Sequence, residues 1–244
     1  MKITVINPNT TRTMTEEIHK AARSAAAPGT EITSVTPIIG PESIECYHDH
    51  YAANLGVMSE VHKATREGSA DGFVVACYGD PGVLACREIT DAPVVGIAEA
   101  SMYMACLVAA KFSIISVLDR ENYELERMVH EYGMQRRCAS IRATGLTVLE
   151  TDSDPEKTMR ELTRQSELAV LQDGAEALLL GCAGMVTFTR ELEEKLGVPV
   201  FDGVIAAVKL VESLVFLGKR TSKIRTFSKP EQKTYLGMNA FLPY

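Results

Sequence analysis

The sequence predicts an α/β protein built from two similar halves, each a doubly wound parallel sheet, with a candidate site in the cleft between them. Short apolar runs typical of buried parallel strands alternate with longer segments of helical character. Two of these runs, within residues 73–82 and 178–185, end alike, with one cysteine entering a glycine-containing turn. Landmarks of the first half recur about 105 to 110 positions later, as expected of a divergent repeat with pseudo-twofold symmetry.

The first half is expected to span residues 1–109. The pattern Thr13-x-x-Glu16 is typical of a capping box that opens a helix, and Pro28 followed by Gly29 is typical of its end. The last helix of this half, rich in Met and Ala, is one that can cross over to the other half. The elements expected in order are a strand at 2–6, a helix to about 28, a strand at 32–36, a loop at 37–47, a helix to about 68, a strand ending at Cys77 and a strand ending near Ile97.

The second half is expected to span residues 110–218 and to repeat the same alternation, which implies helices on both faces of the sheet. A tail at 219–244 carries mainly Lys and Arg, a pattern typical of solvated surface, with a subunit contact as the alternative. The elements expected in order are a strand at 112–117, a helix to about 132, a strand at 141–149, a helix at 154–172, a strand ending at Cys182, a strand at 198–201 and a helix at 204–217.

Composition narrows the class of function. A chain of 244 residues with 46% hydrophobic content can bury a sizeable core, and a net charge of −7 argues against nucleic acid or anionic membranes as partners. No apolar run reaches about 18 residues, and Met1 leads straight into a strand rather than into a signal peptide, so we expect a cytoplasmic protein. Its six cysteines are therefore expected as reduced thiols, and none forms a Cys-x-x-Cys pair.

Cys77 and Cys182 are the candidate catalytic residues. Open parallel sheets bind ligands beyond the carboxyl ends of their strands, so two cysteines on equivalent strands are expected to face each other across one crevice, as the active site. We expect helix N-termini to lower their pKa, so that one thiolate takes a proton while the other thiol donates one from the opposite face. Backbone N–H groups just after each cysteine are expected to stabilise an enolate, at Tyr78, Gly79, Ala183 and Gly184.

Five segments carry a resemblance to a known family: residues 6–11, 40–45, 76–82, 180–185 and 198–204. Together they resemble the hydantoin racemase branch of the aspartate/glutamate racemase superfamily, which includes allantoin racemases, and the resemblance runs from about residue 2 to residue 222. It implies a cofactor-independent racemase in which Cys77 and Cys182 act on C5 of a hydantoin ring, with a place in purine catabolism. It also implies substrate contacts at Asn9, at Ser43 and Ile44, and at the backbone after each cysteine. We further expect a homo-oligomer and a small cyclic ureide as ligand.

One segment departs from that pattern. Residues 46–51 supply Cys46, His48, Asp49 and His50 where the family usually carries a glycine. These side chains belong to metal-ligating types, but they are adjacent rather than spaced for one helix face, so we expect a polar helix start and no metal.

Other functions remain open at this point. The same cysteine pair suits an aspartate/glutamate-type amino-acid racemase or a maleate-type isomerase, whereas an arylmalonate decarboxylase needs only one cysteine. Outside enzymes, the alternatives are a thiol redox sensor that forms a Cys77–Cys182 disulfide and a ureide-binding protein that exchanges no proton.

Overall fold

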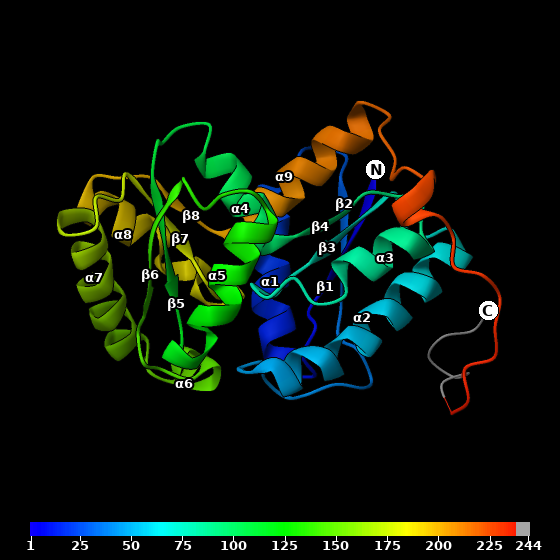
Figure 1. Cartoon of the computed structure of the whole chain (residues 1–244), viewed down its shortest axis with the longest axis horizontal. Coiled ribbons are helices and arrows are strands. Elements are labelled where there is room, and N and C mark those ends of the chain that lie inside the picture. Colours follow the sequence, from blue (N-terminus) through cyan, green and yellow to red (C-terminus); the bar gives the residue numbers. More distant parts are fainter. Residues whose placement is uncertain (238–244) are drawn as a thin grey trace.

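Two four-stranded parallel sheets lie side by side in the computed structural model, which describes residues 1–237 (Figure 1). Their strand orders are β2-β1-β3-β4 and β6-β5-β7-β8, so the same order occurs in both halves. Every neighbouring pair of strands is parallel. The predicted fold class is thereby confirmed. In chain order, the elements are β1 (Lys2–Ile6), α1 (Arg12–Ala25), β2 (Glu31–Val35), α2 (Tyr47–Glu67), β3 (Gly72–Val75), α3 (Val83–Ile89), β4 (Val94–Gly96), α4 (Ile97–Ala105), β5 (Phe112–Ser116), η1 (Asp119–Glu121), α5 (Asn122–Glu131), β6 (Cys138–Ala143), α6 (Val148–Ser153), α7 (Pro155–Leu171), β7 (Ala177–Leu180), η2 (Ala183–Phe188), α8 (Thr189–Leu196), β8 (Val200–Phe201), α9 (Gly203–Phe216) and η3 (Arg225–Phe227).

The strand expected at 141–149 is wrong in its second part. β6 ends at Ala143, and Gly145 then turns the chain with a φ of +79°. Thr147 follows as the N-cap of α6, and its side chain accepts a hydrogen bond from the Glu150 backbone N–H at 3.2 Å. This capping box stabilises a helix where the apolar and β-branched residues suggested a strand.

Helices cover the two sheets in three layers. α2 and α3 pack on the outer face of the first sheet, and α7 and α8 on the outer face of the second (Figure 1). Between the sheets, α1, α4, α5 and α9 share one hydrophobic core with strands of both halves. The two halves are therefore joined by buried apolar surface rather than by a linker.

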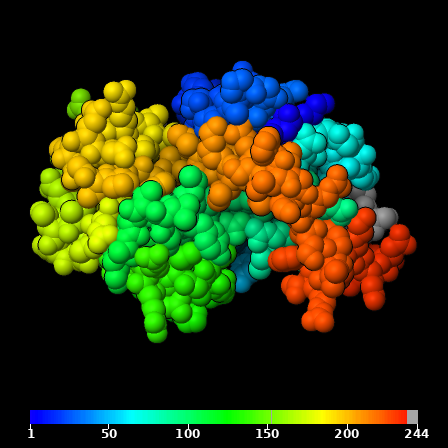
Figure 2. Space-filling view, turned by 90° about the horizontal axis from the view of Figure 1, so that it is seen from above, coloured from blue at the N-terminus to red at the C-terminus, as the bar shows by residue number. Residues whose placement is uncertain are grey.

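α4 and α9 cross in this central layer. A Cβ added at Gly203, the first residue of α9, would lie 2.7 Å from the carbonyl oxygen of Ile97, the first residue of α4. Further along, Val211 of α9 lies directly on β3, because a Cβ at Gly72 would be 2.4 Å from its side chain. α9 thus packs on β3 and β4 of the first half, and α4 packs on β7 of the second. Figure 2 shows α9 lying across the middle of one face of the molecule.

The tail packs against the first half before it leaves the described region. The Thr221 N–H donates to the Asp91 carbonyl at 2.9 Å, and the Lys223 ammonium donates to the Glu88 carbonyl at 3.2 Å, at the end of α3. Most of the remaining tail side chains are exposed, in line with a solvated surface, and residues 238–244 lie outside the described residues. In the part of the chain up to residue 237, no helix combines the length and the apolar character that crossing a membrane requires.

Candidate active site

One small cavity between the two halves is lined by both Cys77 and Cys182. It lies beyond the carboxyl ends of β3 and β7 and has a volume of about 50 Å³. Most of the predicted site residues also line it, namely Asn9, Ile44, Tyr78, Gly79 and Ala183. Ser43 and Gly184 are half-buried and do not contribute to the lining, so their roles stay predictions.

The turn that presents Cys77 is fixed by a buried carboxylate. Asp80 has a φ of +46°, in the left-handed region, and its N–H donates to the Cys77 carbonyl at 3.0 Å. Its two carboxylate oxygens accept the N–H groups of Ala98 and Glu99, each at 3.0 Å, at the start of α4. Gly96 leaves the space for this carboxylate, since a Cβ there would lie 2.2 Å from it. Capping of α4 by Asp80 therefore holds the turn after β3 in one shape.

The expectation that a helix N-terminus lowers the pKa of the cysteines is wrong for Cys77. Burial raises its pKa, a hydrogen bond from the Gly79 backbone N–H opposes this, and the nearby Cys182, Glu121 and Asp80 raise it further. α3 begins only at Val83, after the turn. Desolvation of the thiolate therefore outweighs any help from a helix end, and Cys77 is a thiol at neutral pH.

Cys182 is positioned by close packing of β7 on β5. A Cβ at Gly181 would lie 2.9 Å from the Ile115 carbonyl oxygen and from the Ser116 Cα, and the Gly181 N–H donates to that carbonyl at 2.8 Å. Cys182 then serves as the N-cap residue of η2 and is buried. Only glycine allows this approach, so the sequence directs Cys182 to the cavity at the end of the strand.

Asn9 projects into the cavity with its amide orientation fixed. Its Oδ1 accepts the Thr11 N–H at 2.9 Å and the Asn7 Nδ2 at 2.8 Å, while its own Nδ2 contacts the Met14 sulfur at 3.4 Å. With Oδ1 occupied and sulfur a weak acceptor, the Asn9 NH₂ is the group offered to a ligand. The same network ends the loop at Thr11, so α1 begins at Arg12 and the capping box expected at Thr13 does not form.

Three ionisable side chains in the lining were missed by sequence reasoning. His50 Nδ1 lies 2.8 Å from Glu124 Oε1, a pair that joins α2 to α5. Glu121 also lines the cavity, where burial and then the charges of Glu124 and Glu45 raise its pKa to about 8. His50 belongs to the segment that departs from the family pattern, whereas the two glutamates gave no signal in the sequence.

The segment at 46–51 forms a polar helix start, as expected. Asp49 accepts the Glu45 N–H at 3.2 Å and the Cys46 Sγ–H at 3.1 Å, across the first turn of α2. His48 points to solvent, with 92% of its side chain exposed. Among the side chains that the structure describes, no three or more of His, Cys, Asp or Glu converge as a metal site requires.

Polar contacts also link the two halves around the cavity. Glu45 Oε1 accepts the Val148 N–H at 2.9 Å, and the Tyr132 hydroxyl donates to Asp80 Oδ2 at 2.8 Å. Burial and the charge of Glu99 raise the pKa of Asp80 to about 7. Together with the His50–Glu124 pair, these contacts hold the two halves against each other next to the cavity.

The chain is similar to known racemases both in sequence and in fold. The family model described as Asp/Glu/Hydantoin racemase matches residues 3–211. A hydantoin racemase of Pseudomonas sp. (strain NS671) is 53% identical over 237 residues, covering 97% of this chain and 95% of that protein. A hydantoin racemase of Paenarthrobacter aurescens is 45% identical over 236 residues, covering 97% and 100%. Among solved structures, the allantoin racemase from Klebsiella pneumoniae aligns over 100% of both chains with a TM-score of 0.96 and 44% identity.

Proposed function

The chain belongs to the Asp/Glu/hydantoin racemase family and is an isomerase of the racemase type, and we propose that it inverts C5 of a 5-substituted hydantoin or of allantoin by proton transfer between Cys77 and Cys182. The observation that carries the proposal is that both cysteines line one small cavity between equivalent strand ends. In this proposal a ring held there has one thiol on each face. The relatives named as hydantoin and allantoin racemases support this substrate class.

The proposed reaction balances without an external acid or base. A thiolate at Cys182 takes the C5 proton, and the electron pair left on C5 moves into the ring carbonyl to form an enolate. The Cys77 thiol then donates its proton to the opposite face of C5, which leaves a thiolate at Cys77 and a thiol at Cys182. Burial raises the pKa of Cys77, so in this direction Cys77 is written as the proton donor. The opposite enantiomer reacts by the same steps in reverse.

The ring is held by neutral groups in this proposal. The Asn9 NH₂, oriented by its acceptor bonds, donates to a ring carbonyl, and the backbone N–H group of Ala183 stabilises the enolate oxygen. A C5–H beside a ring carbonyl is already acidified by enolate formation, so the proposed chemistry needs no cofactor.

The charge of the cavity favours a ureide over a dicarboxylate substrate. Among the described residues that line it, the ionisable groups besides the thiols are His50, Tyr78, Glu121 and Glu124, and no lysine or arginine is present. The carboxylates of an amino-acid or maleate substrate would therefore find no lysine or arginine partner among these residues, and burying an unpaired carboxylate is costly. The aspartate/glutamate-type racemase and the maleate-type isomerase are therefore the second choice.

Incubation of each enantiomer of allantoin and of several 5-substituted hydantoins in deuterium oxide tests the proposal. We expect optical rotation to decay to zero while deuterium enters C5. Cys77→Ser and Cys182→Ser should each abolish racemisation, whereas Cys106→Ser, which changes a half-buried thiol outside the cavity, should retain it. Racemisation that persists in a Cys77→Ser, Cys182→Ser double variant would refute the mechanism.

The same protein distinguishes the non-enzymatic alternatives. A redox sensor would form a Cys77–Cys182 disulfide under peroxide, visible by mass spectrometry, and would exchange no C5 proton. A ureide-binding protein would bind allantoin in calorimetry and leave its rotation unchanged.

A further inference from the structure

A second cavity, larger than the catalytic one, lies in the same cleft. Its volume is about 400 Å³, against about 50 Å³ for the cavity that Cys77 and Cys182 line. Three residues contribute to the lining of both cavities: His50, Gly79 and Glu124. These residues therefore stand where the inner and outer cavities meet. The outer cavity is lined in addition by aromatic and apolar residues, such as Tyr47, Tyr51 and Leu84, and by charged ones, namely Asp80, Arg127 and Glu131.

The His50–Glu124 pair fills the space between the two cavities. The two side chains are 13% and 16% exposed, and His50 Nδ1 lies 2.8 Å from Glu124 Oε1. On its other side the His50 ring packs on the backbone of Gly79, where an added Cβ would lie 2.6 Å from the ring. The imidazole is thus held from both sides, by the carboxylate of α5 and by the turn that carries Cys77.

We propose that the His50–Glu124 pair is the partition between the catalytic cavity and the outer cavity, and that the outer cavity holds the C5 substituent of the substrate. The inner cavity is much smaller than the outer one, so a substituent that extends from a ring in the inner cavity toward the outer cavity has to pass the pair. The pair then determines which substituents are accepted. This inference rests on the proposed function, because it assigns the part of the substrate that lies beyond the reacting ring.

The chemistry of the outer cavity identifies the substituent class. Tyr47 and Tyr51 stack with ring centroids 6.5 Å apart, and Leu84 is 59% exposed beside them in the lining. The tyrosine rings and the leucine form an apolar part of a lining that also carries Asp80, Arg127 and Glu131, and this apolar part suits an aryl or a long alkyl group. We therefore infer that such a substituent lies along the tyrosines and Leu84, and that it enters through displacement of the His50 side chain.

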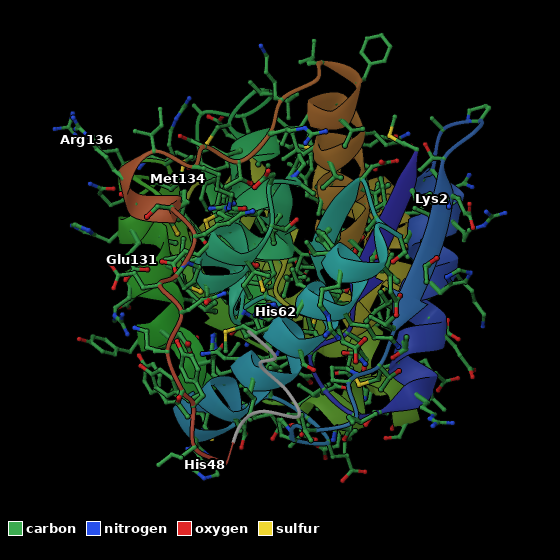
Figure 3. The ribbon with its side chains drawn as sticks, turned by 90° about the vertical axis from the view of Figure 1, so that its right-hand side faces the viewer. Lys2, His48, His62, Glu131, Met134 and Arg136 are labelled. Atoms are coloured by element: carbon green, nitrogen blue, oxygen red, sulfur yellow. The ribbon has the colours of Figure 1, made fainter. Side chains whose placement is uncertain are left out.

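Substrate selectivity is the first test. We compare kcat/KM for 5-benzylhydantoin with that for 5-methylhydantoin in the wild type, in His50→Ala and in Glu124→Gln. Removing the imidazole should raise the benzyl-to-methyl ratio by about tenfold, the range in which pocket size discriminates between apolar groups. The matched control is His48→Ala on the same helix, since His48 is 92% exposed, lies at the periphery (Figure 3) and should leave the ratio unchanged. A ratio that stays at the wild-type value in both His50→Ala and Glu124→Gln overturns the proposal.

Thiol labelling is the second test and does not depend on racemisation. Alkylation of Cys77 by iodoacetamide, a small reagent, and by N-phenylmaleimide, a bulky one, is followed by peptide mass spectrometry. His50→Ala should accelerate the bulky reagent about tenfold more than the small one, while His48→Ala should match the wild type. Equal acceleration of both reagents, or of neither, contradicts a partition at His50. If labelling changes as expected but no hydantoin is racemised, the partition stands and the proposed function fails.

Discussion

Replacing Asn7 by alanine tests how the cavity is organised. Asn7 is 1% exposed, and the two hydrogens of its Nδ2 are shared among three acceptors: Asn9 Oδ1 at 2.8 Å, the Thr11 carbonyl at 3.1 Å and Thr15 Oγ1 at 3.0 Å. Its Oδ1 accepts the Asn9 N–H at 3.3 Å. With two donated bonds and one accepted bond, each contributing about 1 kcal/mol net, Asn7→Ala should lower the free energy of unfolding by about 3 kcal/mol. For a chain of this size the loss corresponds to about 10 °C in Tm.

The same variant should also change substrate binding, because Asn7 orients the Asn9 amide, which we propose donates to the ring. We expect KM for a hydantoin to rise about tenfold, the effect of losing one well-placed hydrogen bond. Urea unfolding followed by circular dichroism gives the stability, and initial rates at several substrate concentrations give KM. The control is Thr10→Ala in the same loop, which removes one bond to the Pro41 carbonyl at 3.2 Å and should cost about 1 kcal/mol or less. An Asn7→Ala protein within about 1 kcal/mol of the wild type would refute the reasoning.

Three further changes test other parts of the structure. Because the pKa of Asp80 is raised to about 7, the folded state binds more protons than the unfolded chain between pH 4 and 7. The free energy of unfolding should therefore fall as pH rises through that window, by up to about 1.4 kcal/mol per pH unit. In urea unfolding of Asp80→Asn this part of the pH dependence should be missing. Glu121→Gln removes a charge that raises the pKa of Cys77, and this charge is present only above the Glu121 pKa of about 8. Alkylation of Cys77 should therefore be faster in the variant than in the wild type at pH 9, and equally fast at pH 6.5. A difference in rate at pH 6.5 only would contradict this reasoning. Gly203→Ala places a Cβ 2.7 Å from the Ile97 carbonyl oxygen and should lower the free energy of unfolding by about 1 to 3 kcal/mol, and a neutral result in urea would show that α9 can shift on α4.

Most of the fold could be predicted from the strand and turn patterns of the sequence. The apolar runs that end at Cys77 and Cys182 became β3 and β7, and Gly68 ended α2 with a left-handed φ of +60°. The prediction failed at residues 144–149, where the Thr147–Glu150 capping box overrode the apolar residues around it. Of two similar sequence patterns, the capping box at Thr147 forms and the one expected at Thr13 does not. At Thr13 the helix starts earlier, because the Asn9 side chain accepts the Thr11 N–H in the folded loop.

The candidate site was predictable only where its residues follow strands. Cys77 and Cys182 stand just past strand ends, which a parallel fold brings to one edge of each sheet. His50 and Glu124 belong to helices of different halves, and nothing in the spacing of the sequence states that α2 and α5 meet. The pKa of Cys77 was misjudged for a related reason, since the extent of its burial depends on how the halves close over it.

The position of α9 on the first sheet has a consequence for biosynthesis. β3 and β4 leave the ribosome on the order of 100 residues before α9, which at roughly 5 to 20 residues per second is a delay of about 5 to 20 seconds. During that delay the surface around Gly72 that Val211 later covers is open to other nascent chains. We expect the amino-terminal half to remain incompletely folded until translation is nearly finished, and to depend in that interval on holding chaperones.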